Sequence, residues 1–225
     1  MIINPKNIDD LAKALEVRFL ANQDKNLHFG LLTDFGDAPK EEMDEDAGNI
    51  ELAAKKITDL NKKYPRENND TFFLFHRNRE WNPKDRVWMG YERKRGKLSD
   101  LNSLLRGGPE NMFSLIIGKT EVFKNIRYVI TLDTDTQLPR DSARQIVGAM
   151  SHPLNRPEYD NKKRRVTEGY CILQPRVAVC LPGTNRSCYA LYNSVSSLIQ
   201  LKQISRLHLL ICENAWKNSQ QPQLK

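Results

Sequence analysis

VITLDTDTQL, residues 129–138, is the stretch that decides the fold class of this chain. It begins as an apolar run with several β-branched residues, which is typical of a buried strand, and it ends in two carboxylates that stand one residue apart. Pro139 follows, and an amphipathic helix pattern begins at about Arg140. A buried strand that leads directly into a helix indicates an α/β fold.

Asp133 and Asp135 stand where ligands bind in open α/β sheets, at the carboxyl end of a strand. The two side chains alternate around Thr134, so both can turn toward one hard cation and offer it oxygen ligands. Mg2+ or Mn2+ held in this way usually carries a phosphate-bearing substrate, because the ion keeps open positions for phosphate oxygens. An ordinary strand end with an Asp-rich turn explains the same residues, so both interpretations stay open at this point.

Helix and strand patterns alternate on both sides of this stretch. Apolar residues recur at helical spacing in residues 7–20, 47–64, 97–106 and from about 140 onward. Strand-like runs occupy residues 27–33, 71–75, 129–133, 166–174 and 176–181, the last two being split at Pro175. His76 to Tyr91 and residues 153–165 lack a regular period and are predicted to be loops. The alternation predicts a mostly parallel sheet that is flanked by helices.

The composition is that of a globular chain with a basic excess. Its 225 residues suffice for one large domain or two small ones, and a hydrophobic content of 39% allows a sizeable core. The net charge of +7 is concentrated in two clusters, Arg93–Lys97 and Lys162–Arg165. Such clusters suit phosphates, nucleic acid or an anionic membrane surface, although solvated faces are the commoner explanation.

Cysteine usage and hydropathy indicate a soluble chain in a reducing compartment. The four cysteines show no CxxC pairing, which argues against a zinc site and favours free thiols. No signal-peptide pattern opens the chain, and no apolar run approaches the roughly 20 residues that a membrane-spanning helix needs. We therefore expect this chain to be cytoplasmic.

Several other residues could line a binding site. Asp34 and Asp37 close the strand at residues 27–33, where they could contact a base or ribose, although an Asx turn is the simpler explanation. Lys97 stands at a predicted helix start, where it could reach a phosphate, but a solvated basic turn fits equally well. Trp81 and Trp88 could stack on a sugar, although packing is the commoner role of such aromatic residues.

Four stretches, taken together, resemble the glycosyltransferase domain of bacterial cyclic β-1,2-glucan synthases. They are LEVRFLANQDKNLHFGLLTDFGDAP, FFLFHRNREWNPKDRVWMGYERKRGKLSDLNSLLRG, RYVITLDTDTQLPRDSARQIVGAMSHPLNRP and GYCILQPRVAVCLP. They cover roughly residues 15–193 in the expected order, and the combination of WMGYERKRGKL with TLDTDTQLPRD is highly specific. In broader terms, the chain is similar to processive inverting transferases with the GT-A nucleotide-sugar fold.

The resemblance implies roles for the residues of a donor site. Asp34 corresponds to the acid that contacts the uridine of the donor. Lys97 and Asn102 match the lysine and asparagine that lie between this acid and the metal motif. Asp133 and Asp135 match the D-x-D that holds Mg2+ or Mn2+ on the sugar diphosphate.

The resemblance also implies a reaction and its partners. Glucose would pass from UDP-glucose to a growing β-1,2-glucan acceptor with inversion of the anomeric centre, and Gln174 would lie at the strand end beneath this acceptor. The remainder of a larger membrane synthase would be a further partner, at the cytoplasmic face of the bacterial inner membrane, and no nucleic-acid partner is expected. A base elsewhere would remove the acceptor proton, and the cleft would exclude competing water.

This sequence also departs from the family pattern. The family's first nucleotide-binding strand would precede the helix at residues 7–20, and this sequence lacks it. After Asn193, the sequence also lacks a catalytic acid used as base and a Gln-x-x-Arg-Trp-like motif. We therefore expect residues 1–193 to form a partial glycosyltransferase domain, incomplete at both ends, which keeps the donor half of the site. Residues 194–225 form a divergent tail that is consistent with a shifted reading frame. The chain would then be a synthase fragment or an inactive nucleotide-sugar-binding remnant.

A phosphatase of the haloacid-dehalogenase type is the rival enzyme class. In that interpretation, Asp133 would be the nucleophile and Asp135 the general acid and base. The residues after Asp135 contain no adjacent acidic pair, which this class requires, and Asp34 would have no role. Nucleic-acid binding fits less well, because aromatic residues are not interleaved with the basic clusters.

Overall fold

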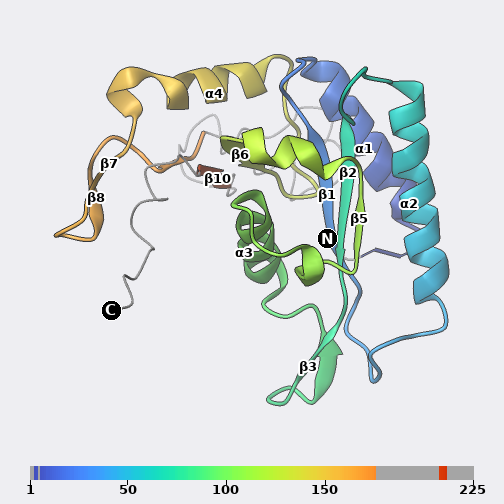
Figure 1. Ribbon diagram of the computed structural model, residues 1–225. Coiled ribbons are helices and arrows are strands. Elements are labelled where there is room, and N and C mark those ends of the chain that lie inside the picture. The colour runs from blue at the N-terminus through green and yellow to red at the C-terminus, as the bar shows by residue number, and fades with distance from the viewer. Residues whose placement is uncertain (1–2, 5, 176–207, 212–225) are drawn as a thin grey trace, which may run out of the picture. The chain divides into compact units, whose positions relative to one another are not determined.

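The computed structural model describes residues 3–4, 6–175 and 208–211, which divide between two compact units (Figure 1). The first unit comprises residues 1–126 and 137–144, and the second comprises residues 127–136 and 145–225. Each unit contains a three-stranded sheet of its own.

The first unit is built on a mixed sheet with the strand order β1-β2-β5. β1 and β2 are parallel, in a register that runs from Phe29 opposite Phe72 to Asp34 opposite Arg77, and β5 is antiparallel to β2. In chain order, the elements of this unit are α1 (Ile8–Ala21), β1 (Phe29–Asp34), α2 (Asp46–Lys63), β2 (Phe72–Arg77), β3 (Glu80–Asn82), β4 (Val87–Met89), α3 (Arg93–Leu105), η1 (Glu110–Met112), β5 (Leu115–Ile117) and η2 (Thr120–Asn125).

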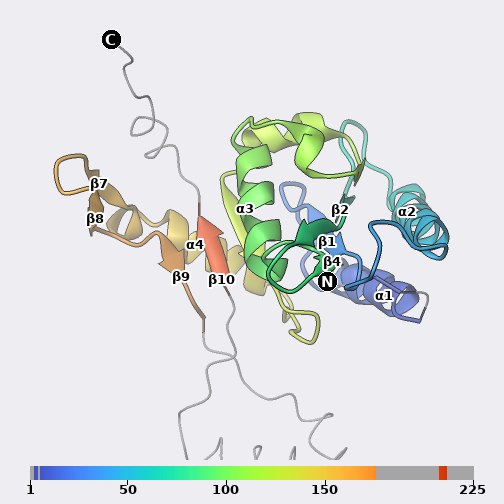
Figure 2. The same cartoon turned by 90° about the horizontal axis from the view of Figure 1, so that it is seen from below.

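β2 is the centre of the core in the first unit, because all six of its residues are buried. Alternate side chains of a strand point to opposite faces of the sheet. Phe72 and Leu74 pack in one apolar cluster with α1 and α2, whereas Phe73 and Phe75 pack in another with residues of α3 and η2. Figure 2 shows α1 and α2 on one side of β1 and β2, and α3 on the other. Burial on both faces explains why this strand is a continuous apolar run rather than an alternating one.

The second unit holds the strand that leads into Asp133. Its sheet has the order β6-β10-β9, and both of its strand pairs are antiparallel. Met150 is buried there, and Tyr128, Ile130, Ile146 and Leu173 pack around it. The elements are β6 (Tyr128–Thr131), η3 (Pro153–Asn155), β7 (Glu158–Asp160), β8 (Arg165–Glu168), β9 (Ile172–Leu173) and β10 (His208–Ile211), together with α4 (Ser142–Ser151), which begins in the first unit and ends in the second.

The structure confirms the predicted α/β class and all four predicted helices, with α3 beginning at Arg93 rather than at Lys97. Between the strands that the structure describes, β1 and β2 form the parallel pair and the other pairs are antiparallel, so the sheets are mixed. The strand predicted at residues 176–181 lies outside the described residues. So does the predicted tail at residues 194–225, apart from β10.

The prediction of loops at residues 76–91 and 153–165 was wrong, because each region contains strands of a β-hairpin. β3 and β4 pair within residues 76–91, and β7 pairs with β8 across the Lys-rich segment. Strands of three or four residues are too short to show a period. A turn signal was present in both cases: the side chains of Asn82 and Asp160 each accept hydrogen bonds from the backbone N–H groups two and three residues further on.

The helices are amphipathic rather than apolar all round. α2 has 18 residues and is the longest described helix; it buries Ala53, Ile57 and Leu60 and exposes charged residues such as Glu51 and Lys55. Within the described ranges, no helix combines the length and the apolar character that crossing a membrane requires.

Candidate functional site

β1 and β2 end side by side with an acid and a base. Asp34 is the last residue of β1, and Arg77, the last residue of β2, lies directly opposite it in the parallel register. Parallel strands end at the same edge of a sheet, which is where ligands bind in α/β folds. Both side chains are nevertheless buried, with Asp34 3% and Arg77 6% exposed.

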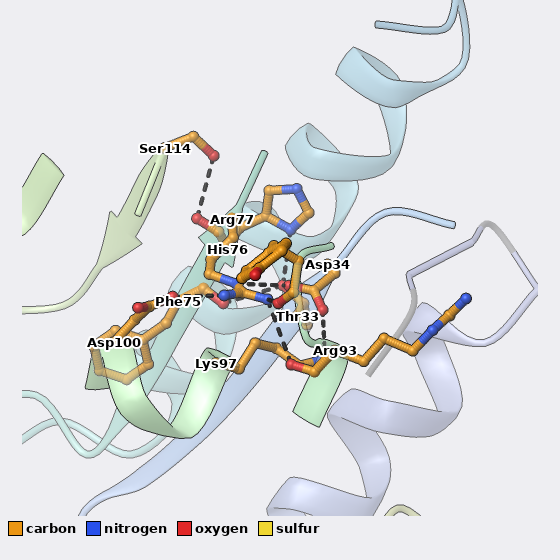
Figure 3. A network of polar contacts seen from close by, with 10 residues as sticks. Thr33, Asp34, Phe75, His76, Arg77, Arg93, Lys97, Asp100 and Ser114 are labelled. Atoms are coloured by element: carbon orange, nitrogen blue, oxygen red, sulfur yellow. Dashed lines mark hydrogen bonds and ion pairs between the residues drawn. The ribbon is translucent and has the colours of Figure 1, made fainter. Parts of the chain in front are cut away.

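Cations hold both oxygens of the Asp34 carboxylate (Figure 3). Arg77 Nε donates to Asp34 Oδ1 over 3.1 Å, and Lys97 Nζ lies 2.8 Å from Asp34 Oδ2. Arg77 Nη1 also donates to Asp100 Oδ2, on α3, over 2.5 Å. We call these four residues the Asp34 network. Its two acids balance its two bases, as buried ionised groups require.

Two glycines make room for the Asp34 network. A Cβ atom at Gly90 would lie 2.7 Å from the carboxyl carbon of Asp34. A Cβ atom at Gly96, in the first turn of α3, would lie 2.3 Å from the carbonyl oxygen of Tyr91 and 2.9 Å from Arg77 Nη1. Only glycine fits at such distances, so this close approach explains both glycines of the WMGYERKRGKL stretch.

A second buried ion pair fixes the segment that follows β1. Arg79 pairs with Asp46, at the start of α2, through both Nη atoms. Arg79 Nε donates to the carbonyl oxygen of Gly36 over 2.6 Å, and the guanidinium lies 4.6 Å from the centroid of the Phe35 ring. Burial alone would raise the pKa of Asp46, but the hydrogen bonds from Arg79 and from the Met43 N–H hold it below its ordinary value.

His76 is fully buried beside these ion pairs and is neutral. The Thr33 hydroxyl donates to the Phe75 carbonyl oxygen over 3.2 Å and lies 2.9 Å from His76 Nδ1. Because this hydroxyl has one proton, Nδ1 donates to Thr33 Oγ1, and Nε2 is the unprotonated nitrogen. Nε2 has no hydrogen-bond partner among the described residues. Burial lowers the pKa of His76 to about 4, against the opposing effect of Asp34 and Asp46.

The structure brings two of the predicted donor residues together. Lys97 is 5% exposed and pairs with Asp34, so it is not the solvated cation of a basic turn. Asn102 lies further along α3 and is half-buried. Asp37, in contrast, is exposed and pairs with Arg93 at the beginning of α3.

The other predicted residues belong to the second unit. Asp133 and Asp135 lie shortly after β6, which ends at Thr131, and Asp133 is half-buried whereas Asp135 is exposed. The N–H of Thr136 donates to the carbonyl oxygen of Asp133 over 3.1 Å, so the predicted turn is present. In the described part of the chain, no group of three or more His, Cys, Asp or Glu residues gathers around one point, so Asp133 and Asp135 have no third residue of these types beside them. Gln174 is exposed and follows β9.

The sequence interpretation missed Arg77, Asp100 and the Arg79–Asp46 pair. Two signals could have found the first two residues. Arg77 ends a strand that follows the Asp34 strand along the chain, and parallel neighbours align such strand ends. Asp100 lies three residues after Lys97 on one helix, where side chains share a face.

Comparison with known proteins gives one informative relative. No family model matches the chain. Over 181 residues, which are 80% of its length, the chain is 41% identical to the cyclic beta-(1,2)-glucan synthase NdvB of Rhizobium meliloti (strain 1021). The matched segment spans 6% of the length of that synthase. The chain is therefore related in sequence to the cyclic β-(1,2)-glucan synthases over most of its length.

Proposed function

We propose that this chain contributes the donor side of a UDP-glucose-dependent glycosyltransferase that builds β-1,2-glucan. The observation that carries the proposal is the 41% identity to a cyclic beta-(1,2)-glucan synthase over 181 residues. The position of Asp34 at the carboxyl end of a parallel strand supports it, since nucleotides bind at this edge in α/β folds. The phosphatase alternative gains no support from the same comparison.

Asp34 and Lys97 are the proposed contacts to the nucleotide. A carboxylate can accept a hydrogen bond from an N–H of the uracil ring, and an ammonium group can bind a phosphate. Because Lys97 now pairs with Asp34 2.8 Å away, donor binding would give Lys97 a phosphate oxygen in place of the carboxylate. Arg77 would remain on Asp34 during this exchange, so the buried acid would keep a cation.

Asp133 and Asp135 are the proposed ligands of a divalent ion, Mg2+ or Mn2+. Two carboxylates at a strand end, one half-buried and one exposed, suit an ion that takes its remaining ligands from water and from phosphate oxygens. When bound, such an ion neutralises charge on the departing diphosphate. Neither aspartate needs a third protein ligand for this role.

Gln174 is the proposed contribution to the acceptor side. Its exposed amide at the end of β9 can donate to and accept from sugar hydroxyls. Transfer also requires a base that removes the acceptor proton. We assign no residue to this base, and we propose that the chain by itself binds the donor without transferring glucose.

Titration calorimetry with UDP, in the presence and absence of Mn2+, tests the proposal on the 225-residue chain. We expect UDP binding that Mn2+ strengthens by about tenfold or more, and that loses this dependence in Asp135→Asn. Asp141→Asn is the matched control, because Asp141 is another exposed aspartate a short way further along the chain, and its φ of 59° suits asparagine. A wild-type chain that ignores UDP but hydrolyses a generic phosphomonoester would support the phosphatase instead.

A further inference from the structure

Arg77 links three parts of the first unit through one guanidinium group. Nε donates to Asp34 at the end of β1, and Nη1 donates to Asp100 on α3. Nη2 donates to the carbonyl oxygen of Tyr91 over 2.9 Å and to that of Arg93 over 3.4 Å, where the chain enters α3. Figure 3 labels Arg77 and Arg93. The side chain therefore ties the carboxylate to the start of the helix that carries Lys97.

These contacts use the fixed shape of arginine. The planar guanidinium points its donors in set directions, so contacts on three sides fix both its own plane and the groups that accept from it. Lysine has a single ammonium group and cannot reach Asp34, Asp100 and the two carbonyl oxygens together. Gly96 leaves the space that Nη1 occupies, because a Cβ atom at this position would lie only 2.9 Å from Nη1.

We infer that Arg77 is a positioning residue of the donor site, which fixes the Asp34 carboxylate in the orientation that selects the nucleoside part of the ligand. This inference rests on the proposed function, because it assigns to Asp34 the contact with uracil. Arg77 itself touches no ligand in this assignment. The Nε–H of Arg77 uses one lone pair of Asp34 Oδ1. This contact decides which lone pairs of the carboxylate remain to accept a hydrogen bond from an N–H of the base.

A purely structural role for Arg77 is the competing explanation, and Arg79 provides the matched control. Both arginines are 6% exposed and each forms a buried ion pair. Arg79 pairs with Asp46 and makes no ion pair with Asp34. Replacement of either arginine by lysine should therefore destabilise the fold, but only Arg77→Lys should alter nucleoside selection.

The test compares a ligand that carries a nucleoside on its diphosphate with the diphosphate alone. Dissociation constants of UDP and of inorganic pyrophosphate are measured by calorimetry with Mn2+ on the full chain. For Arg77→Lys we expect UDP affinity to fall about tenfold, while pyrophosphate affinity stays within about threefold of the wild type. For Arg79→Lys we expect the melting temperature to fall and the ratio of the two constants to stay that of the wild type.

Asp100→Asn is a second variant that keeps the test decisive if Arg77→Lys does not fold. It removes the charge on the far side of Arg77 and leaves every direct contact of Asp34 in place. We expect a smaller loss of UDP affinity with pyrophosphate affinity retained. Equal losses for both ligands, or an Arg79→Lys ratio that moves as far as that of Arg77→Lys, would overturn the inference. A wild-type chain that does not bind UDP would remove the proposed function, and the inference with it.

Discussion

Burial of His76, beside the candidate site, costs free energy of folding. The side chain is fully buried, and its Nε2 has no hydrogen-bond partner in the described ranges. Burial lowers its pKa from 6.5 to about 4, so the folded chain binds a proton at this residue less readily than the unfolded chain does. The free energy of unfolding is therefore highest above pH 6.5, where His76 is neutral in both states, and it falls as the pH drops toward 4, because the unfolded chain takes up the proton first.

The pH dependence of unfolding tests this interpretation. Between pH 7 and pH 5 we expect the free energy of unfolding of the wild type to fall by about 2 kcal/mol on account of His76. His76→Asn cannot titrate, and it should be less stable at pH 7 but flatter in its pH profile, as measured by urea denaturation. His28→Asn is the comparison variant: burial also lowers the pKa of His28, but this side chain is only half-buried, so its replacement should flatten the pH profile less than His76→Asn does. A His76→Asn profile as steep as that of the wild type would contradict the assignment.

Single residues were predictable from sequence only where a neighbouring pattern fixed their place. Asp34 ends an apolar strand, so its position at a sheet edge could be predicted. Strand order and helix spacing make Arg77 and Asp100 candidate partners, but their ion pairs also depend on which strands are neighbours and on how α3 approaches them. Lys97 illustrates the difference: its place near the start of a helix was foreseen, whereas its burial against Asp34 follows from tertiary contacts.

At the scale of elements, α3 contains a glycine where helices usually disfavour one. Glycine costs a helix roughly 1 kcal/mol relative to alanine. Gly96 lies in the first turn of α3, and a Cβ there would meet a backbone oxygen at 2.3 Å and the Arg77 guanidinium at 2.9 Å. Glycine at this position therefore lowers the helix propensity of α3, but it allows the helix backbone to lie close to the Asp34 network.

Two glycine substitutions with opposite signs test this account. Gly48 also lies in the first turn of a helix, α2, and a Cβ there would meet nothing within 4 Å. We expect Gly48→Ala to raise the free energy of unfolding by roughly 0.5–1 kcal/mol and Gly96→Ala to lower it by about 1–3 kcal/mol, as measured by urea denaturation. A Gly96→Ala chain as stable as the wild type would show that the space around this residue is not restricted.

Elements were predictable in proportion to their length. α1 and α2 each bury several apolar residues at helical spacing, and the predicted boundaries lie within a residue or two of the observed ones. The two hairpins were missed because their strands are short and only the side chains of Asn82 and Asp160 mark the turns. Helix α3 begins earlier than predicted, directly after Glu92, which has a left-handed φ of 50°. No pattern in the basic cluster predicts this backbone conformation.

At the scale of the whole molecule, the two units differ in how they bury apolar surface. The first unit has clusters on both faces of its sheet, and Phe72, Phe73 and Leu74 are each at most 2% exposed. In the second unit, Met150 is the fully buried apolar side chain among the described residues. Exposed strands of the β7–β8 hairpin contribute little apolar burial. Since stability follows burial, we expect backbone amides of β2 to be the best protected.

Leu74→Ala tests whether the two units are also energetic units. Removal of a fully buried leucine side chain should lower the free energy of unfolding of the first unit by about 3 kcal/mol. Hydrogen exchange, measured by mass spectrometry, should then speed up across β1, β2 and β5 and remain unchanged in β7 and β8. Val166→Ala, at a half-buried position of β8, is the control and should leave β2 protected. Equal loss of protection in β2 and in β7–β8 after Leu74→Ala would mean that the chain unfolds as one cooperative body. A substitution in the core of one unit can speed up amide exchange in the other unit only if the two units unfold together.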